Sequence, residues 1–168
     1  MKKRKIGRMI CAVFLWMIFL TSITVIAYLS FQDGESSAEL GSEVIEKLAV
    51  WYYKTDNISS TDLYRFTYYI RQLGRAVLFF AIGILGTTAV HISSSRIPWL
   101  LKTAVAVGTL ILIAWVTEKW KIYFPTRHYS ETEMMISIWA ALLGFSVVSL
   151  ITLIYDLVCR ISHKAASD

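Results

Sequence analysis

Four long apolar stretches alternate with polar segments along the chain. They cover approximately residues 9–30, 73–91, 98–117 and 134–158. An α-helix rises about 1.5 Å per residue, so about 20 apolar residues cross a hydrocarbon core of ~30 Å. The pattern therefore predicts an all-α fold, an integral membrane bundle of four transmembrane helices in a single domain over residues 1–168.

The first apolar stretch follows a strongly basic N-terminus. Its basic residues are Lys2, Lys3, Arg4, Lys5 and Arg8. Cleaved signal peptides have shorter apolar cores, of roughly 7 to 15 residues, followed by small residues at the cleavage site. Here the apolar run is longer, and the bulky Tyr28 stands near its end. We interpret the stretch as a signal anchor, with a cleaved signal peptide as the alternative.

Residues 31–72 are the most polar part of the chain and contain an amphipathic pattern. Its apolar positions at helical spacing are Leu40, Val44, Ile45, Leu48 and Trp51. Charged residues fall on the other positions, which predicts an interfacial amphipathic helix in the plane of the membrane. The alternative is that the apolar face packs on the bundle. Ser59 or Ser60 can then cap a new helix that runs into the second span.

Small residues and a proline shape the middle of the bundle. Gly83 and Gly86 lie inside the second span, where small residues let helices approach closely in lipid. We expect these glycines to serve packing rather than chemistry. Pro98 suits the first turn of the third span, so a short turn joins spans two and three as a hairpin.

The composition supports a membrane protein, because 56% of the residues are apolar and 17% are charged. The formal net charge is +5, and the basic residues gather beside apolar runs instead of forming a separate basic surface. Anionic membrane lipid is therefore the expected counter-charge, and nucleic acid is not an expected partner.

Cysteines and histidines give no sign of a metal or cofactor. Cys11 and Cys159 lie at the edges of apolar runs, on the side that we assign to the reducing cytoplasm, so a structural disulfide is not expected. His91, His128 and His163 are scattered and do not have metal-ligand spacing. We expect neither a metal site nor a cofactor.

The charges of the short connecting segments set the expected topology. Basic residues precede the first span, occupy the turn between spans two and three, and follow the fourth span. Because Lys and Arg of short segments remain cytoplasmic, both termini are expected in the cytoplasm. Segments 31–72 and 118–133 are then on the outer side. They also contain basic residues, but the N-terminal cluster decides the orientation.

Charged residues at the outer ends of spans two, three and four form the candidate site. They are Arg71, Arg75, Glu118, Lys121, Arg127 and Glu133. Arg71 and Arg75 are four residues apart and share a helix face, where paired guanidinium groups suit a phosphate or a carboxylate. The expected ligand is thus an anion at the headgroup layer.

Each of these residues also has a structural interpretation. Arg71 and Arg75 can be snorkelling anchors for a short span, and Glu118 with Lys121 can be an exposed helical pair. Ser130 and Glu133 have the spacing of a capping box. No nucleophile has a base beside it, so binding is expected rather than catalysis. Glu118 and Glu133 can act as an acid and a base only if they converge.

The order of several motifs resembles that of the VanZ-like membrane proteins, over roughly residues 14–150. The matching stretches are 30–37, 70–75, 117–121, 124–127 and 133–144. Glu118, Arg127 and Gly144 keep the family pattern. Five positions depart from it: Arg75 replaces a histidine, Lys121 a glutamine, Glu133 an aspartate, Ser137 an asparagine and Ala140 a glycine. The chain resembles a divergent member of this family.

The resemblance implies a multi-pass protein of the bacterial cytoplasmic membrane, related to one that lowers susceptibility to the glycopeptide teicoplanin. An arginine in place of histidine removes a group that titrates near neutrality and favours anion binding. We therefore expect binding of an anionic lipid-linked or cell-wall component at the outer surface. A membrane hydrolase or transferase for lipid-linked precursors, and an accessory subunit of a transporter or sensor, are the alternatives.

Overall fold

The computed structural model describes residues 2–31, 34–54, 58–93, 97–123 and 129–165, with the backbone alone at residues 2–5, 29–31, 34–43, 159–160 and 163–165. Its elements are α1 (Lys2–Phe31), α2 (Gly34–Tyr53), α3 (Ser60–Ser93), α4 (Trp99–Lys119), the 3₁₀ turn η1 (Trp120–Tyr123) and α5 (Glu131–Ala165). The described residues contain no strand, which confirms the all-α prediction.

Within the described residues, four helices are long and apolar enough to cross a membrane. They are α1, α3, α4 and α5, and the most apolar windows of their spans have mean hydropathies of 1.9 to 2.5. Large apolar side chains such as Leu100, Leu112 and Ile154 are exposed along these helices. An apolar exterior of this kind is stable in lipid rather than in water. The protein is a multi-pass membrane protein.

The helices are longer than the apolar stretches that predict them. The expected span 73–91 lies within α3, which begins at Ser60 and continues without a break to Ser93. The amide of Leu63 donates to the carbonyl oxygen of Ser59 over 2.9 Å, so the helix begins at the predicted serines. In the same way, the expected span 134–158 lies within α5.

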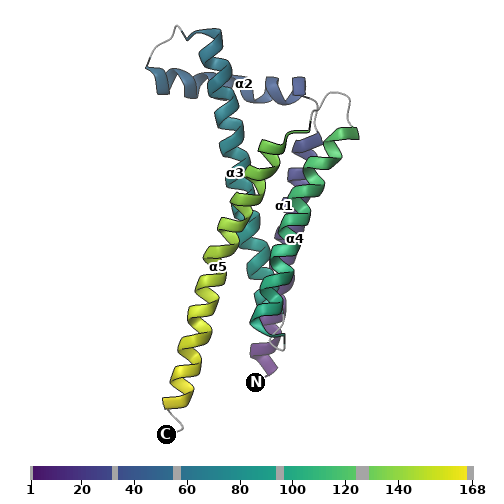
Figure 1. The fold of residues 1–168 in the computed structure, drawn as a ribbon, viewed down its shortest axis with the longest axis vertical. Coiled ribbons are helices and arrows are strands. Elements are labelled where there is room, and N and C mark those ends of the chain that lie inside the picture. Colours follow the sequence, from purple (N-terminus) through teal and green to yellow (C-terminus); the bar gives the residue numbers. More distant parts are fainter. Residues whose placement is uncertain (1, 32–33, 55–57, 94–96, 124–128, 166–168) are drawn as a thin grey trace.

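The four spanning helices run along the long axis of the molecule, and both termini lie at the same end (Figure 1). The remaining long helix, α2, lies across this axis at the opposite end (Figure 1). The crosswise direction agrees with the predicted interfacial helix. Its side chains Val44, Leu48 and Trp51 are exposed, whereas Ala49 is buried. The exposed apolar side chains therefore do not pack on the bundle.

Helix α3 is the central element, because α1, α2, α4 and α5 all contact it. The buried apolar cluster is formed by Phe19, Ile26, Phe79, Ile82, Leu110, Ala114, Ala140 and Ala141. Glycines allow the closest approaches within it. A β-carbon at Gly83 would overlap the backbone of Ala141 in α5, and one at Gly144 would overlap the backbone of Phe80 in α3. These contacts support the packing role expected of Gly83.

Gly86 has the same role between α3 and α1. The ring of Phe19 occupies the space that a β-carbon at Gly86 would need. The neighbouring Thr87 is completely buried, and its hydroxyl donates to the carbonyl oxygen of Gly83 over 2.6 Å. Since this hydroxyl is satisfied within its own helix, it adds no unpaired polar group to the apolar core.

Candidate functional site

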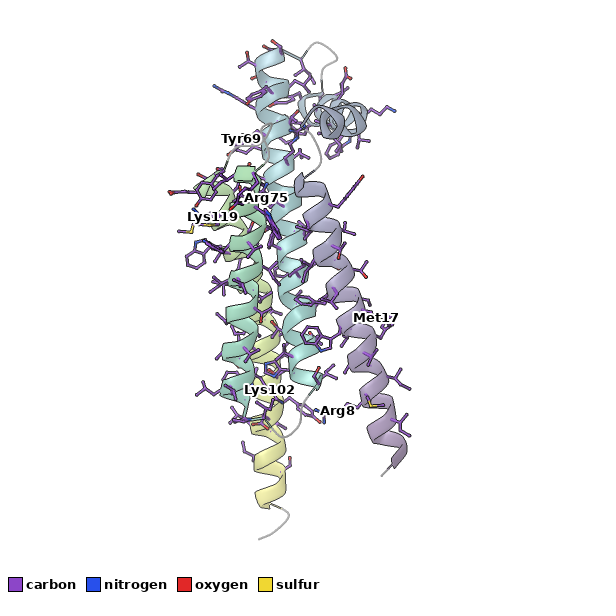
Figure 2. The ribbon with its side chains drawn as sticks, turned by 90° about the vertical axis from the view of Figure 1, so that its right-hand side faces the viewer. Arg8, Met17, Tyr69, Arg75, Lys102 and Lys119 are labelled. Carbon is purple, nitrogen blue, oxygen red and sulfur yellow. The ribbon has the colours of Figure 1, made fainter. Side chains whose placement is uncertain are left out.

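Four of the predicted site residues meet in one ionic cluster at the end of the bundle away from the termini. Arg75 comes from α3, Glu118 from α4, Lys121 from η1 and Glu133 from the first turn of α5. Figure 2 shows Arg75 at this end of the bundle, far from Arg8 and Lys102. Arg75 is 43 residues from Glu118, and Glu133 is 12 residues from Lys121, so the helix bundle brings these residues together.

Lys121 is the most enclosed cation of the cluster. Its Nζ lies 2.8 Å from Glu118 Oε2 and 2.9 Å from Glu133 Oε2. The side chains of Lys121 and Glu118 are each only 3% exposed. The first contact joins residues three apart, Glu118 in the last turn of α4 and Lys121 in η1, and side chains at this spacing are neighbours on one side of a helix. The interpretation of Glu118 and Lys121 as an exposed pair is therefore wrong.

Arg75 joins both carboxylates from the other side. Its Nη1 lies 2.9 Å from Glu118 Oε2, and its Nη2 lies 2.7 Å from Glu133 Oε2. The side chains of Arg75 and Glu133 are 22% and 25% exposed. The cluster is therefore closed around Glu118 and Lys121 and partly open at Arg75 and Glu133.

Neighbouring polar groups fix the orientation of the carboxylates. The side chain of Gln72 donates to Glu133 Oε1 over 3.2 Å, and the amide of Ser130 donates to Glu118 Oε1 over 3.4 Å. The sequence prediction missed Gln72. Gln72 could have been identified from its position three residues before Arg75, because this spacing places both residues on one side of α3.

The predicted capping box forms only in part. The hydroxyl of Ser130 accepts a hydrogen bond from the amide of Glu133 over 3.4 Å, as an N-cap residue does. In a complete box the glutamate would bind the amide of Ser130. Here Glu118 accepts the hydrogen bond from the amide of Ser130, and the carboxylate of Glu133 binds Arg75 and Lys121 instead.

The cluster contains two cations and two carboxylates, so its formal charges balance. Burying these charges is costly unless each is paired and hydrogen-bonded, and the geometry supplies both. A snorkelling arginine extends its guanidinium group toward the lipid headgroups. Arg75 instead forms salt bridges with Glu118 and Glu133, so it is more than a snorkelling anchor. An incoming anion would have to compete with one of the two carboxylates.

Two predicted residues are not part of the cluster. Arg71 is exposed, one turn before Arg75 on α3, and forms no ion pair with a described residue. Arg127 lies outside the described residues. Within the described part of the chain, no three His, Cys, Asp or Glu side chains are grouped to hold a metal ion.

No protein-family model, curated protein or solved structure matches this chain. The fold and the ionic cluster therefore define its class. It is a multi-pass, all-α membrane protein that joins three of its four candidate spans by a buried salt-bridge cluster at one end of the bundle.

Proposed function

We propose that this protein binds an anionic group, a phosphate or a carboxylate of a lipid-linked or cell-wall component, at the outer surface of a bacterial cytoplasmic membrane. The single observation that carries the proposal is the partly exposed guanidinium group of Arg75, held by one buried and one accessible carboxylate. The resemblance to VanZ-like proteins supports the envelope setting and a link to teicoplanin tolerance.

Glu133 is the group that an incoming anion would replace. It is 25% exposed, whereas Glu118 is 3% exposed and would keep Arg75 in place. A phosphate or carboxylate has the two oxygens that a guanidinium fork binds. After the exchange, Glu133 would still be favoured at the N-terminal end of α5, where the helix dipole stabilises negative charge.

Arg71 would provide a second cation for the same ligand. It is exposed and lies four residues before Arg75 on the same helix, so the two side chains project from neighbouring turns. A ligand with two anionic groups, such as a diphosphate, fits this pair better than a single carboxylate does.

The orientation belongs to the proposal as well. Both termini lie at the end of the bundle opposite the ionic cluster (Figure 1). The basic N-terminus favours the cytoplasm for that end, which leaves the cluster at the outer surface.

One observation favours the hydrolase alternative. Glu118 and Glu133 converge, because both carboxylates contact Lys121. A general acid or base must exchange its proton with a substrate, however, and here each carboxylate is occupied by two cations. We therefore favour binding over catalysis. Hydrolysis of a labelled lipid-linked precursor by the parent, lost in Glu118→Gln, would reverse this preference.

A binding experiment tests the proposal directly. The purified full chain is titrated with a short-chain polyprenyl diphosphate and, separately, with a peptide that has a free C-terminal carboxylate. Arg75→Gln should bind at least about tenfold more weakly, because a hydrogen bond to a charged group is worth about 1.5–3 kcal/mol. Arg71→Gln, at an exposed position that cannot disturb the core, should weaken binding of the diphosphate.

Arg65→Gln is the matched control, since Arg65 is also exposed on α3 and takes no part in the cluster. It should bind like the parent. When the same variants are produced in a bacterial host at equal membrane levels, their teicoplanin tolerance should fall in the same order as their ligand affinity. Unchanged affinity in both Arg71→Gln and Arg75→Gln would refute the proposal.

A further inference from the structure

A second polar site lies at the other end of the bundle, where α3 ends and α4 begins. A pocket of about 890 Å³ opens there, with walls from α1, α3, α4 and α5. Its charged lining residues are Arg8, Lys102 and Asp156. Figure 2 shows Arg8 and Lys102 at this end, away from Arg75. The proposed function above makes no use of this pocket.

Both cations of the pocket have donor capacity that the described contacts do not use. Arg8 donates through Nε to the carbonyl oxygen of Ile92 over 2.9 Å, which leaves the two terminal nitrogens of its guanidinium fork. Lys102 Nζ lies 3.5 Å from the carbonyl oxygen of His91, at the outer limit of a hydrogen bond. These contacts cap the C-terminal end of α3, but they occupy few of the available donors.

Two further features of the pocket favour a ligand. His91 Nε2 is buried without a hydrogen-bond partner among the described residues, which is rare for a buried polar atom. Pro98 and Trp99, at the N-terminus of the 21-residue helix α4, line the same pocket, and no side chain of a described residue caps this terminus. A helix N-terminus attracts an anion through its free amides and its dipole.

The formal charge of the lining is positive when His91 is neutral, because Arg8 and Lys102 outweigh Asp156. The remaining walls include apolar side chains such as Ile97 and Tyr155. The pocket also lies at the ends of spanning helices, the depth at which lipid headgroups are found. Basic pockets between spanning helices are typical sites for anionic headgroups.

We propose that this pocket binds the phosphate of an anionic phospholipid from the leaflet on the side of the termini. The Arg8 fork and the Lys102 ammonium donate to the phosphate oxygens, and the apolar walls receive the start of the acyl chains. The bound lipid would thereby connect α1 to α4 at the end of the bundle where α3 stops.

Native mass spectrometry of the full chain, purified and delipidated in a neutral detergent, tests this site. Phosphatidylglycerol should be retained in preference to phosphatidylcholine. Arg8→Gln and Lys102→Gln should each weaken phosphatidylglycerol binding about fivefold, the value expected for one cation near a membrane surface. Asp156→Asn should strengthen it, because a negative charge leaves the lining. Arg65→Gln, at the other end of α3, should match the parent.

Thermal unfolding of each variant shows whether it is folded, and the gain in Asp156→Asn cannot arise from misfolding. Equal retention of the two lipids by the parent would overturn the proposal. Phosphatidylglycerol binding that is unchanged in both Arg8→Gln and Lys102→Gln would also overturn it. Displacement of phosphatidylglycerol by an equal concentration of glycerol 3-phosphate would show a site for a soluble phosphate, and would overturn the assignment to lipid.

Discussion

Lys121 shows how strongly a single residue of this protein depends on its partners. Its ammonium group is almost completely buried, and three oxygen contacts from Glu118 and Glu133 surround it. A buried ion pair adds little net stability, but removing one partner leaves an uncompensated charge. The four-residue cluster should therefore respond as a unit to substitution.

Lys121→Met should lower the free energy of unfolding by about 3–5 kcal/mol, because two carboxylates would then share the single guanidinium group of Arg75. The double variant Lys121→Met with Glu133→Gln restores the charge balance and should recover part of this loss. Lys119→Met is the control, since its ammonium lies 4.6 Å from the ring centroid of Tyr129 and should cost about 1 kcal/mol or less. Unfolding in detergent, followed by circular dichroism, measures these values. Equal stability of Lys121→Met and the parent would contradict a charge-coupled cluster.

The sequence pattern was sufficient to single out the four charged residues of the cluster but not their pairing. Charged side chains at the ends of apolar runs identified Arg75, Glu118, Lys121 and Glu133. Their convergence depends on how the helices cross, which local patterns do not contain. Arg71 shares a face with Arg75 but lies one turn before it on α3, and its side chain is exposed. Its exposure therefore depends on which helices pack beside this turn of α3, and the residue type alone does not predict it.

At the scale of elements, the hydropathy pattern predicted which segments are helical but not where the helices end. An apolar run indicates which residues lie in the hydrocarbon core. A helix can continue beyond that core as long as its backbone hydrogen bonds are satisfied. Helix α3 therefore extends from the predicted span into the aromatic and polar segment that begins at Ser60. The predicted amphipathic helix is α2, and its burial of Ala49 rather than Trp51 could not be read from periodicity alone.

The crossing of α3 and α5 makes a second prediction. Gly83→Ala should reduce stability by about 1–3 kcal/mol, because the added methyl group overlaps the backbone of Ala141, which cannot move as a side chain can. Gly108→Ala is the matched control, since a β-carbon there meets nothing within 4 Å. That variant should be neutral or slightly stabilising, because alanine favours helix more than glycine does. Thermal unfolding in detergent compares the two. Similar stabilities of the Gly83→Ala and Gly108→Ala variants would mean that α3 and α5 do not cross at Gly83.

The whole molecule is a bundle with two chemically different ends. At one end, Arg75 and its partners connect α3 to α4 and α5 through salt bridges. At the other end, Arg8 of α1 and Lys102 of α4 contact the last carbonyl groups of α3. Helix α3 is thus bound at two levels, through its own Arg75 to carboxylates of α4 and α5, and through its C-terminal carbonyl groups to cations of α1 and α4. Because the two sites lie at opposite ends of the spanning helices, they are expected on opposite faces of the membrane (Figure 2).

This arrangement predicts the result of cysteine mapping in cells. In a background with Cys11 and Cys159 replaced by serine, an impermeant maleimide should label Arg71→Cys in intact cells. Ser162→Cys, near the C-terminus, should react only after the membrane is permeabilised, because we propose that the basic N-terminus places that end in the cytoplasm. The reverse pattern would mean an inverted protein, with the ionic cluster facing the cytoplasm and the proposed outer ligand excluded. Labelling of both positions from one side would contradict the bundle itself, since Arg71 and the C-terminus lie at opposite ends of the spanning helices.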